Sequence, residues 1–191
     1  VEFNLHLDEV CDLLIQGKAD IGITFESLLS RECNAYTLLS ENYLLALPRT
    51  EETVLIGSPY SVDGRYRKLQ KQDAEIIRKF PMINTYRHEE RQESLSKFLG
   101  TDLKTSNISA LTLQNRLSFV AQGIGCAICQ EKLVAIETAK EKCVFLSLDD
   151  LFKPQNLVIA WPQNSYTNTA ARLFCKEALS YYRPNCGYSD V

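Results

Sequence analysis

The N-terminal part of the chain alternates between strand-like and helix-like spacing of its apolar residues. Apolar side chains between Asp8 and Gly17 recur every three or four positions, which predicts an amphipathic helix with Asp8 as its N-cap and Gly17 as its stop. Short apolar runs at 2–5 and 19–24 predict a strand on either side. A strand, a helix and a strand in so few residues predict a βαβ unit, whose two strands run parallel.

The same alternation continues to the C-terminus. A further apolar run at 53–56 follows a buried strand that ends at Pro48. We predict strands over 43–48, 81–85, 124–129, 143–146 and 157–161. We predict helices over 109–123, 130–138 and 168–182, and a charged helix that ends at Gly100. Ser109 is the expected N-cap of the helix that ends at Gly123. The pattern is typical of an α/β protein with mainly parallel sheets.

Composition and charge narrow the class of protein. The 191 residues carry 21 Lys and Arg against 24 Asp and Glu, a net charge of −3, and 45% are hydrophobic, which is typical of a globular chain that does not itself bind nucleic acid. The polar stretch 57–80 holds several basic residues, and we interpret it as a solvated loop and helix face. No run of ~18 apolar residues predicts a membrane span. The start lacks both an initiator Met and a signal peptide, so we expect a piece of a longer protein.

The cysteine pattern argues for reduced thiols. An odd count of seven, mostly inside apolar runs, disfavours a secreted disulfide framework and favours a cytoplasmic protein. Cys126 and Cys129 form a C-x-x-C pair, but residues three apart in a strand point to opposite faces. Structural thiols are therefore favoured over a zinc or redox site, and a redox role stays open.

The candidate chemical motifs are weak. Gly123-Ile124-Gly125 follows a predicted helix and precedes a strand, the reverse of the order in a dinucleotide-binding loop. Neither His6 nor His88 stands in a catalytic or metal-binding arrangement. His6 does lie at a predicted strand-to-helix turn, where ligands approach open α/β sheets. We expect neither enzymatic activity, nor a cofactor, nor a metal.

Two segments resemble a known family. Residues 13–23, LLIQGKADIGI, resemble the L-x-x-G-x-x-D-x-x-I signature in the effector-binding domain of LysR-type transcriptional regulators, and 117–128, LSFVAQGIGCAI, resemble that family's V-x-x-G-x-G-I segment. Residues 43–48 and 81–83 are similar to two strands that lie between these motifs. The resemblance implies a two-lobed, type 2 periplasmic-binding-protein-like α/β fold with mixed, mainly parallel sheets joined by two crossover strands. It implies one lobe at 1–47 and 163–191, incomplete at its N-terminus, and a second lobe at 48–162.

The resemblance also implies an effector site. Carried over position by position, the family's effector contacts correspond to His6, Leu7, Ile23, Phe25, Ile83, Asn84, Thr85, Ser109 and Ala110. For Ile23, Ile83 and Ala110 a core position is the alternative. Phe25 stands where several relatives that sense aromatic acids carry Arg, a role that Arg87 would then take. No cysteine lies between residues 34 and 125, where peroxide-sensing relatives carry a cysteine pair.

The expected function follows from the family. We expect an effector-sensing and oligomerisation domain that binds a small molecule between its lobes, forms a homodimer or homotetramer, and contacts DNA only through a winged helix-turn-helix outside this chain. The alternative is the solute-binding protein of a transporter, which shares the fold but is exported and tolerates free thiols poorly. An enzyme on the same scaffold would need an acid–base set that the sequence lacks.

Overall fold

In the computed structural model, which describes residues 9–84, 89–110, 112–163 and 168–182, the chain divides into two units. Unit 1 comprises Val1–Glu41 and Gln155–Val191, and unit 2 comprises Asn42–Pro154. This division assigns β3 (Tyr43–Pro48) to unit 2 and β8 (Gln155–Pro162) to unit 1. The lobe boundaries at 47/48 and 162/163 stay a prediction.

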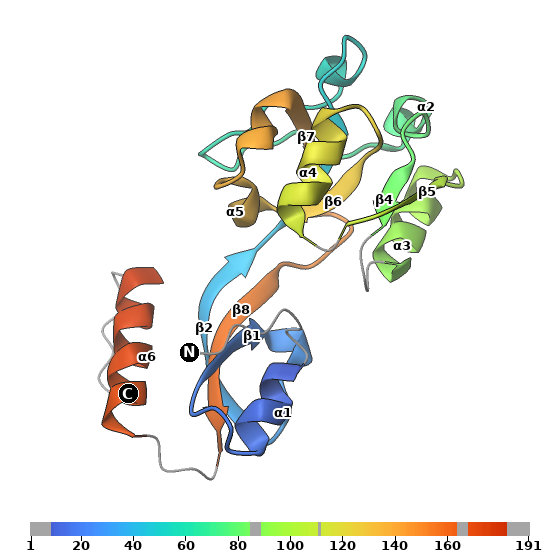
Figure 1. Cartoon of the computed structure of the whole chain (residues 1–191). Helices are drawn as coiled ribbons and strands as arrows, with labels where there is room; N and C mark the ends of the chain where they lie inside the picture. The colour runs from blue at the N-terminus through green and yellow to red at the C-terminus, as the bar shows by residue number, and fades with distance from the viewer. Residues whose placement is uncertain (1–8, 85–88, 111, 164–167, 183–191) are drawn as a thin grey trace. The chain divides into compact units, whose positions relative to one another are not determined.

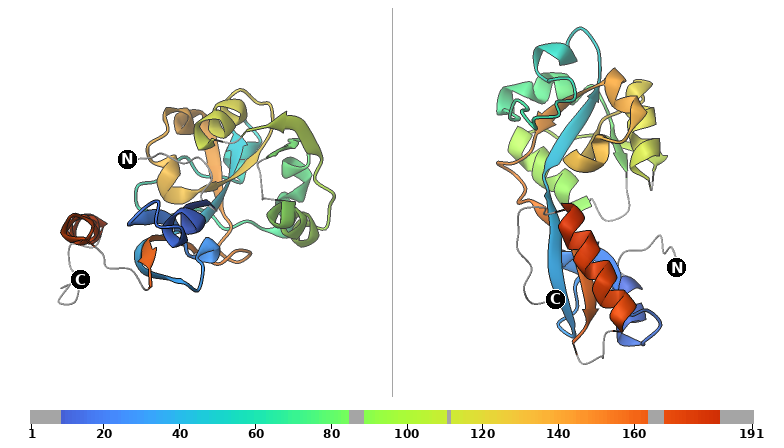
Figure 2. Two further views of the ribbon diagram at one scale, coloured as in Figure 1. Left: turned by 60° about the horizontal axis from the view of Figure 1, so that its bottom comes forward. Right: turned by 90° about the vertical axis from the view of Figure 1, so that its left-hand side faces the viewer.

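Unit 1 is a three-stranded sheet with a helix on each face (Figure 1). Its central strand, β8, pairs antiparallel with both β1 (Gly22–Phe25) and β2 (Cys33–Glu41). Ile159 and Ala160 are neighbours on β8 and therefore point to opposite faces. Ala160 packs against α1 (Glu9–Ile15), whereas Ile159 packs against α6 (Thr169–Tyr182). Figure 2 shows α6 alongside the sheet of this unit.

Unit 2 contains a mixed sheet. β6 (Ala127–Gln130) and β7 (Cys143–Ser147) flank β3 and run antiparallel to it, and β4 (Met82–Asn84) pairs parallel with β5 (Thr105–Ser109). Two backbone hydrogen bonds join β4 to β6 in parallel orientation: Ile83 N donates to Cys126 O at 2.8 Å, and Cys126 N donates to Pro81 O at 2.9 Å. Among these strands β3 alone is reversed.

The reversed strand in each unit is the one that enters from the other unit. β3 follows β2 after a single residue, and β8 follows the last residues of unit 2. A strand that enters from the opposite end of a sheet must run against the strands already there. The α/β fold with mixed sheets is as predicted. The sheets are not mainly parallel in the described residues, because β8 and β3 each run antiparallel to both neighbours, and β4 with β5 is the parallel ladder. A parallel pair was predicted between the strands at 2–5 and 19–24, but residues 2–5 lie outside the described ones, so this pair stays a prediction. The described partner of β1 is β8, and the two strands run antiparallel.

The helices of unit 2 cover both faces of its sheet. They are α2 (Ala74–Ile77), α3 (Glu89–Leu99), α4 (Leu113–Ala121) and α5 (Glu131–Val134). Along β3, Leu45 and Leu47 join one hydrophobic cluster, whereas Leu44 and Ala46 join the other. Every residue of β3 is buried as a result, which is why this strand reads as a continuous apolar run.

Several predicted elements differ from the observed ones. The helix predicted over 130–138 is only the short α5, and the apolar run at 53–56, for which no element was predicted, contains a 3₁₀ helix at Thr53–Leu55. Strands β2 and β5 were not predicted, because they carry many polar residues and lie at sheet edges. The helices that end at Gly17 and Gly100 are confirmed, and both glycines have positive φ, 68° and 65°.

The polar stretch 57–80 is more than a solvated surface. Leu69 and Ile77 are buried in the core of unit 2. Asp73 is buried too, and both of its carboxylate oxygens accept hydrogen bonds from Arg67, at 2.7 and 3.0 Å. Arg67 is thus part of a structural ion pair rather than of a free basic patch. The interpretation of this stretch as a solvated face is therefore wrong for Leu69, Asp73 and Ile77, which are buried. The ion pair that Asp73 forms depends on the path of the loop, which the spacing of residues along the chain does not reveal.

Candidate functional site

The carboxyl ends of β4 and β5 bring two of the predicted effector contacts side by side. Asn84 and Ser109 are register partners in the parallel pair, and Ala110 N donates to Asn84 O at 2.9 Å. The Asn84 side chain donates to Ser106 O at 3.4 Å. Ser109 is exposed and Asn84 is half-buried, so both can reach a ligand. In α/β sheets, ligands bind beyond the carboxyl ends of parallel strands.

Two other predicted contacts of unit 2 are core residues. Ile83 and Ala110 are each only 3% exposed and belong to the hydrophobic cluster that includes Leu117 and Phe145. This burial favours the alternative that the sequence analysis left open for both, namely packing rather than ligand contact. Thr85 lies outside the described residues.

The N-cap of α4 is Thr112, not Ser109 as predicted. The Thr112 side chain accepts a hydrogen bond from Asn115 N at 3.3 Å. Ser109 instead ends β5, three residues earlier. The sequence prediction was wrong because β5 was missed, and without that strand the helix was extended back to the first capping residue type. The cap of α4 follows Ser109 by three residues along the chain, and Ser109 is the register partner of Asn84. The amides at the start of this helix carry a partial positive charge.

Arg116 is a functional candidate that was not predicted from the sequence. It is only 5% exposed, and its Nη1 donates to Ile128 O in β6 at 3.0 Å, while its Nε has no hydrogen-bond partner among the described residues. Burial lowers the pKa of its guanidinium. The signal was present in the sequence: position 116 lies on the apolar stripe of α4 with Leu113, Leu117 and Val120, where a charged residue is out of place.

Unit 1 contributes candidates from β1. Ile23 and Phe25 pair with Ile159 and Leu157 of β8. Ile23 is 39% exposed, which removes the core alternative for its side chain, and Phe25 is half-buried. Among the described residues of unit 1, these two are the predicted effector contacts. His6 and Leu7 lie outside the described residues.

The C-x-x-C cysteines occupy opposite faces of the sheet, as predicted. Cys126 belongs to the cluster around Leu45 and Cys129 to the cluster around Leu44, and both thiols are fully buried. Cys126 Sγ contacts Met82 Sδ at 3.2 Å. Burial raises the pKa of each thiol to about 12. This environment stabilises the neutral thiol and disfavours the nucleophilic thiolate.

We expect Cys126 and Cys129 to resist alkylation in the folded protein at pH 8. With a pKa of about 12, roughly 1 thiol in 10,000 is ionised at that pH, against roughly a quarter in the unfolded chain. Iodoacetamide labelling followed by peptide mass spectrometry checks this, with a urea-denatured sample as the positive control. Rapid native labelling of either residue would contradict the burial argument.

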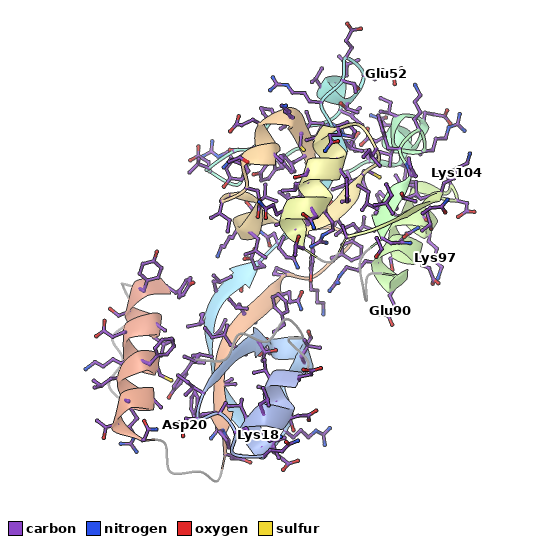
Figure 3. All side chains as sticks on the ribbon, in the orientation of Figure 1. Lys18, Asp20, Glu52, Glu90, Lys97 and Lys104 are labelled. Atoms are coloured by element: carbon purple, nitrogen blue, oxygen red, sulfur yellow. The ribbon has the colours of Figure 1, made fainter. Side chains whose placement is uncertain are left out.

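Charged side chains lie mainly on the outside of the units. Figure 3 shows Glu90, Lys97 and Lys104 directed away from the sheet of unit 2. Within the described parts of the chain, no three His, Cys, Asp or Glu residues gather as a metal site would require. None of the described helices is both long and apolar enough to cross a membrane.

Comparison with known proteins decides the family. The model of the LysR substrate binding domain matches residues 1–183 of the chain. The chain belongs to this family. The match confirms the resemblance and the type 2 periplasmic-binding-protein-like fold, and it does not favour the transporter alternative.

Solved structures of LysR-family regulators share the fold of this LysR substrate binding domain. The regulatory domain of CcmR from Synechocystis PCC6803, in complex with 2-PG, has a TM-score of 0.68 at 11% identity over 94% of this chain and 81% of that chain. HinK from Pseudomonas aeruginosa has a TM-score of 0.67 at 18% identity over 93% of this chain. The effector binding domain of QuiR, in complex with shikimate, has a TM-score of 0.64 at 14% identity over 93% of this chain and 78% of that chain.

This LysR substrate binding domain spans 57% of the HinK chain. No curated protein sequence is similar enough to count as a match.

Proposed function

We propose that this LysR substrate binding domain senses a small-molecule effector for a DNA-binding transcriptional regulator. Two solved structures with the same fold contain a bound small molecule: CcmR is in complex with 2-PG and QuiR with shikimate. The observation that carries the proposal is the edge where Asn84, Ser109 and the start of α4 come together. Such an edge offers amide, hydroxyl and backbone N–H groups that can orient a small ligand.

The proposed effector contacts are the residues implied by the family, and the exposure of each side chain indicates which of them can touch a ligand. Asn84 and Ser109 in unit 2 and Ile23 and Phe25 in unit 1 have side chains that solvent reaches. His6, Leu7 and Thr85 remain proposed contacts. Ile83 and Ala110 would act by supporting this edge from the core.

The effector acts by changing the relative populations of two conformations of the regulator. A ligand changes the activity of a regulator only if it binds two conformations with different affinity, and the size of the shift equals that difference. We propose that the domain forms a homodimer or homotetramer and that DNA is contacted by a winged helix-turn-helix elsewhere in the regulator.

Calorimetric screening of small metabolites, with shikimate among them, tests the proposal. We expect at least one saturable ligand, and we expect Ser109→Ala and Thr85→Ala each to weaken it about three- to tenfold through a lost hydrogen bond. Ser94→Ala is the matched control, because the Ser94 hydroxyl is exposed and donates to Glu90 O on α3. Unchanged affinity in Ser109→Ala and Thr85→Ala would remove both residues from the site, and the absence of any ligand would refute effector sensing.

A further inference from the structure

Two buried polar atoms of the described residues lack a hydrogen-bond partner, and both lie near the carboxyl end of β6. They are Arg116 Nε and Gln130 Oε1. Gln130 is the last residue of β6, and Arg116 is anchored on Ile128 O two residues before it. Gln130 shares a sheet face with Ile128, whereas α4 packs on the other face with Cys129. The two atoms therefore belong to different environments, and only Arg116 is charged.

Arg116 is a buried cation for which the described residues supply no counter-charge. No carboxylate in the described part of the chain forms an ion pair with it, and the thiol of Cys129 beside it has a pKa of about 12 and is neutral. The nearest acidic residue along β6 and α5, Glu131, accepts a hydrogen bond from the Asn42 side chain instead. A guanidinium stays protonated in proteins, so its burial carries a desolvation penalty that one hydrogen bond to a carbonyl does not offset.

The position of Arg116 directs its charge toward the ligand edge. Helical side chains lean toward the N-terminus of their helix, and Arg116 is the fourth residue of the nine-residue α4. By this rule its guanidinium extends toward the first turn of α4, and its Nη1 reaches Ile128 O, two residues before the carboxyl end of β6. Helix N-termini favour anions, and Arg116 adds a full positive charge to that preference.

We propose that Arg116 recognises an oxyanion, a carboxylate or a phosphate, of the effector. The inference rests on the proposed function and specifies the chemical class of the ligand. An oxyanion at the start of α4 satisfies the unpartnered Nε and supplies the missing counter-charge. Guanidinium and oxyanion geometries match for paired hydrogen bonds. A residue that is out of place on an apolar stripe is then explained by binding rather than by folding.

Arg116→Met tests the proposal, because methionine removes the charge and keeps an unbranched side chain of similar length. The probes are benzoate and inorganic phosphate, which distinguish a carboxylate from a phosphate site, and benzamide as the neutral match of benzoate, all at constant ionic strength. Thermal unfolding of the wild type is expected to shift upward saturably with at least one anion and not with benzamide. Arg116→Met is expected to bind that anion at least tenfold more weakly and, without ligand, to melt no lower than the wild type.

Control variants separate the alternatives. Arg78→Met removes an exposed arginine that pairs with Glu75, and is expected to leave anion binding unchanged. If Arg116→Met does not fold, Arg116→Lys keeps the charge without the guanidinium plane and is expected to bind the anion several-fold more weakly. Equal anion binding in the wild type and the folded Arg116 variant, or no saturable response of the wild type to either anion, would overturn the proposal.

Calorimetric screening of small metabolites distinguishes a failure of anion recognition by Arg116 from a failure of effector sensing. A neutral effector that binds the wild type and Arg116→Met equally overturns anion recognition and leaves effector sensing intact. Only the absence of ligands of every charge overturns both.

Discussion

Replacing Asp73 by alanine is expected to lower the free energy of unfolding by about 2–4 kcal/mol. The Asp73 side chain is 1% exposed and accepts hydrogen bonds from Arg67 at 2.7 and 3.0 Å and from Gln70 N at 2.8 Å. The carboxylate raises the pKa of the Arg67 guanidinium through these hydrogen bonds, although burial opposes the change. Removal of the carboxylate leaves a partly buried cation and a backbone amide without their acceptor.

The backbone of Arg67, the residue that pairs with Asp73, joins the stretch 57–80 to the sheet. Arg67 O accepts a hydrogen bond from Ser147 N, and Leu69 N donates to Ser147 O, at the end of β7. Loss of Asp73 is therefore expected to loosen this edge as well. Urea unfolding followed by circular dichroism measures the change.

Asp150→Ala is the matched control for Asp73→Ala. Asp150 pairs with Lys68, the residue next to Arg67, at 2.6 Å, but both side chains are about 60% exposed. An exposed ion pair contributes little in water, so a change of less than about 1 kcal/mol is expected. Equal losses in the two variants would show that burial is not what makes the Arg67–Asp73 pair important.

Gly125→Ala is expected to destabilise unit 2 by about 3 kcal/mol or more, enough to reduce the folded yield. A Cβ at Gly125 would collide with the backbone carbonyl oxygen of Pro81 and lie 3.1 Å from Ile83 Cγ1. The collision cannot be relieved by a side-chain rotation, because Pro81 O accepts the hydrogen bond from Cys126 N that joins β4 to β6. The two strands would have to separate.

The other glycine of the motif provides the comparison. Gly123 has a φ of 78°, and a Cβ there would meet no atom within 4 Å, so Gly123→Ala has only the conformational penalty of about 1 kcal/mol. Thermal and urea unfolding of both variants test the ranking. A larger loss in Gly123→Ala than in Gly125→Ala would contradict the close-approach explanation of the G-x-G motif.

Local patterning was sufficient for the elements whose apolar residues recur regularly. The helices that end at Gly17 and Gly100 and the strand that ends at Pro48 were predictable because each carries its own periodicity and its own stop signal. The two family motifs, each built on a glycine between a helix and a strand, also lie in the sequence itself. These features depend on neighbours along the chain, so a single sequence contains them.

The ligand edge was predictable only in part. The resemblance pointed to Asn84 and Ser109, which the structure pairs in register. It also pointed to Ile83 and Ala110, whose burial depends on the helices that cover the sheet. It did not point to Arg116. The apolar stripe of α4 marks this residue as unusual, but only the structure shows that its side chain is buried with an unpartnered Nε among the described residues.

The sequence by itself determined the family, the α/β class and most helices, because helix periodicity and stop residues act over a few positions. Only the tertiary structure decided that β3 and β8 run against their neighbours, that Arg67 is held by Asp73, and that Arg116 is buried without a counter-charge from the part of the chain that the structure describes. Strand pairing, ion pairing and burial join residues far apart along the chain. Their free energies depend on distances in space, which the order of residues does not specify.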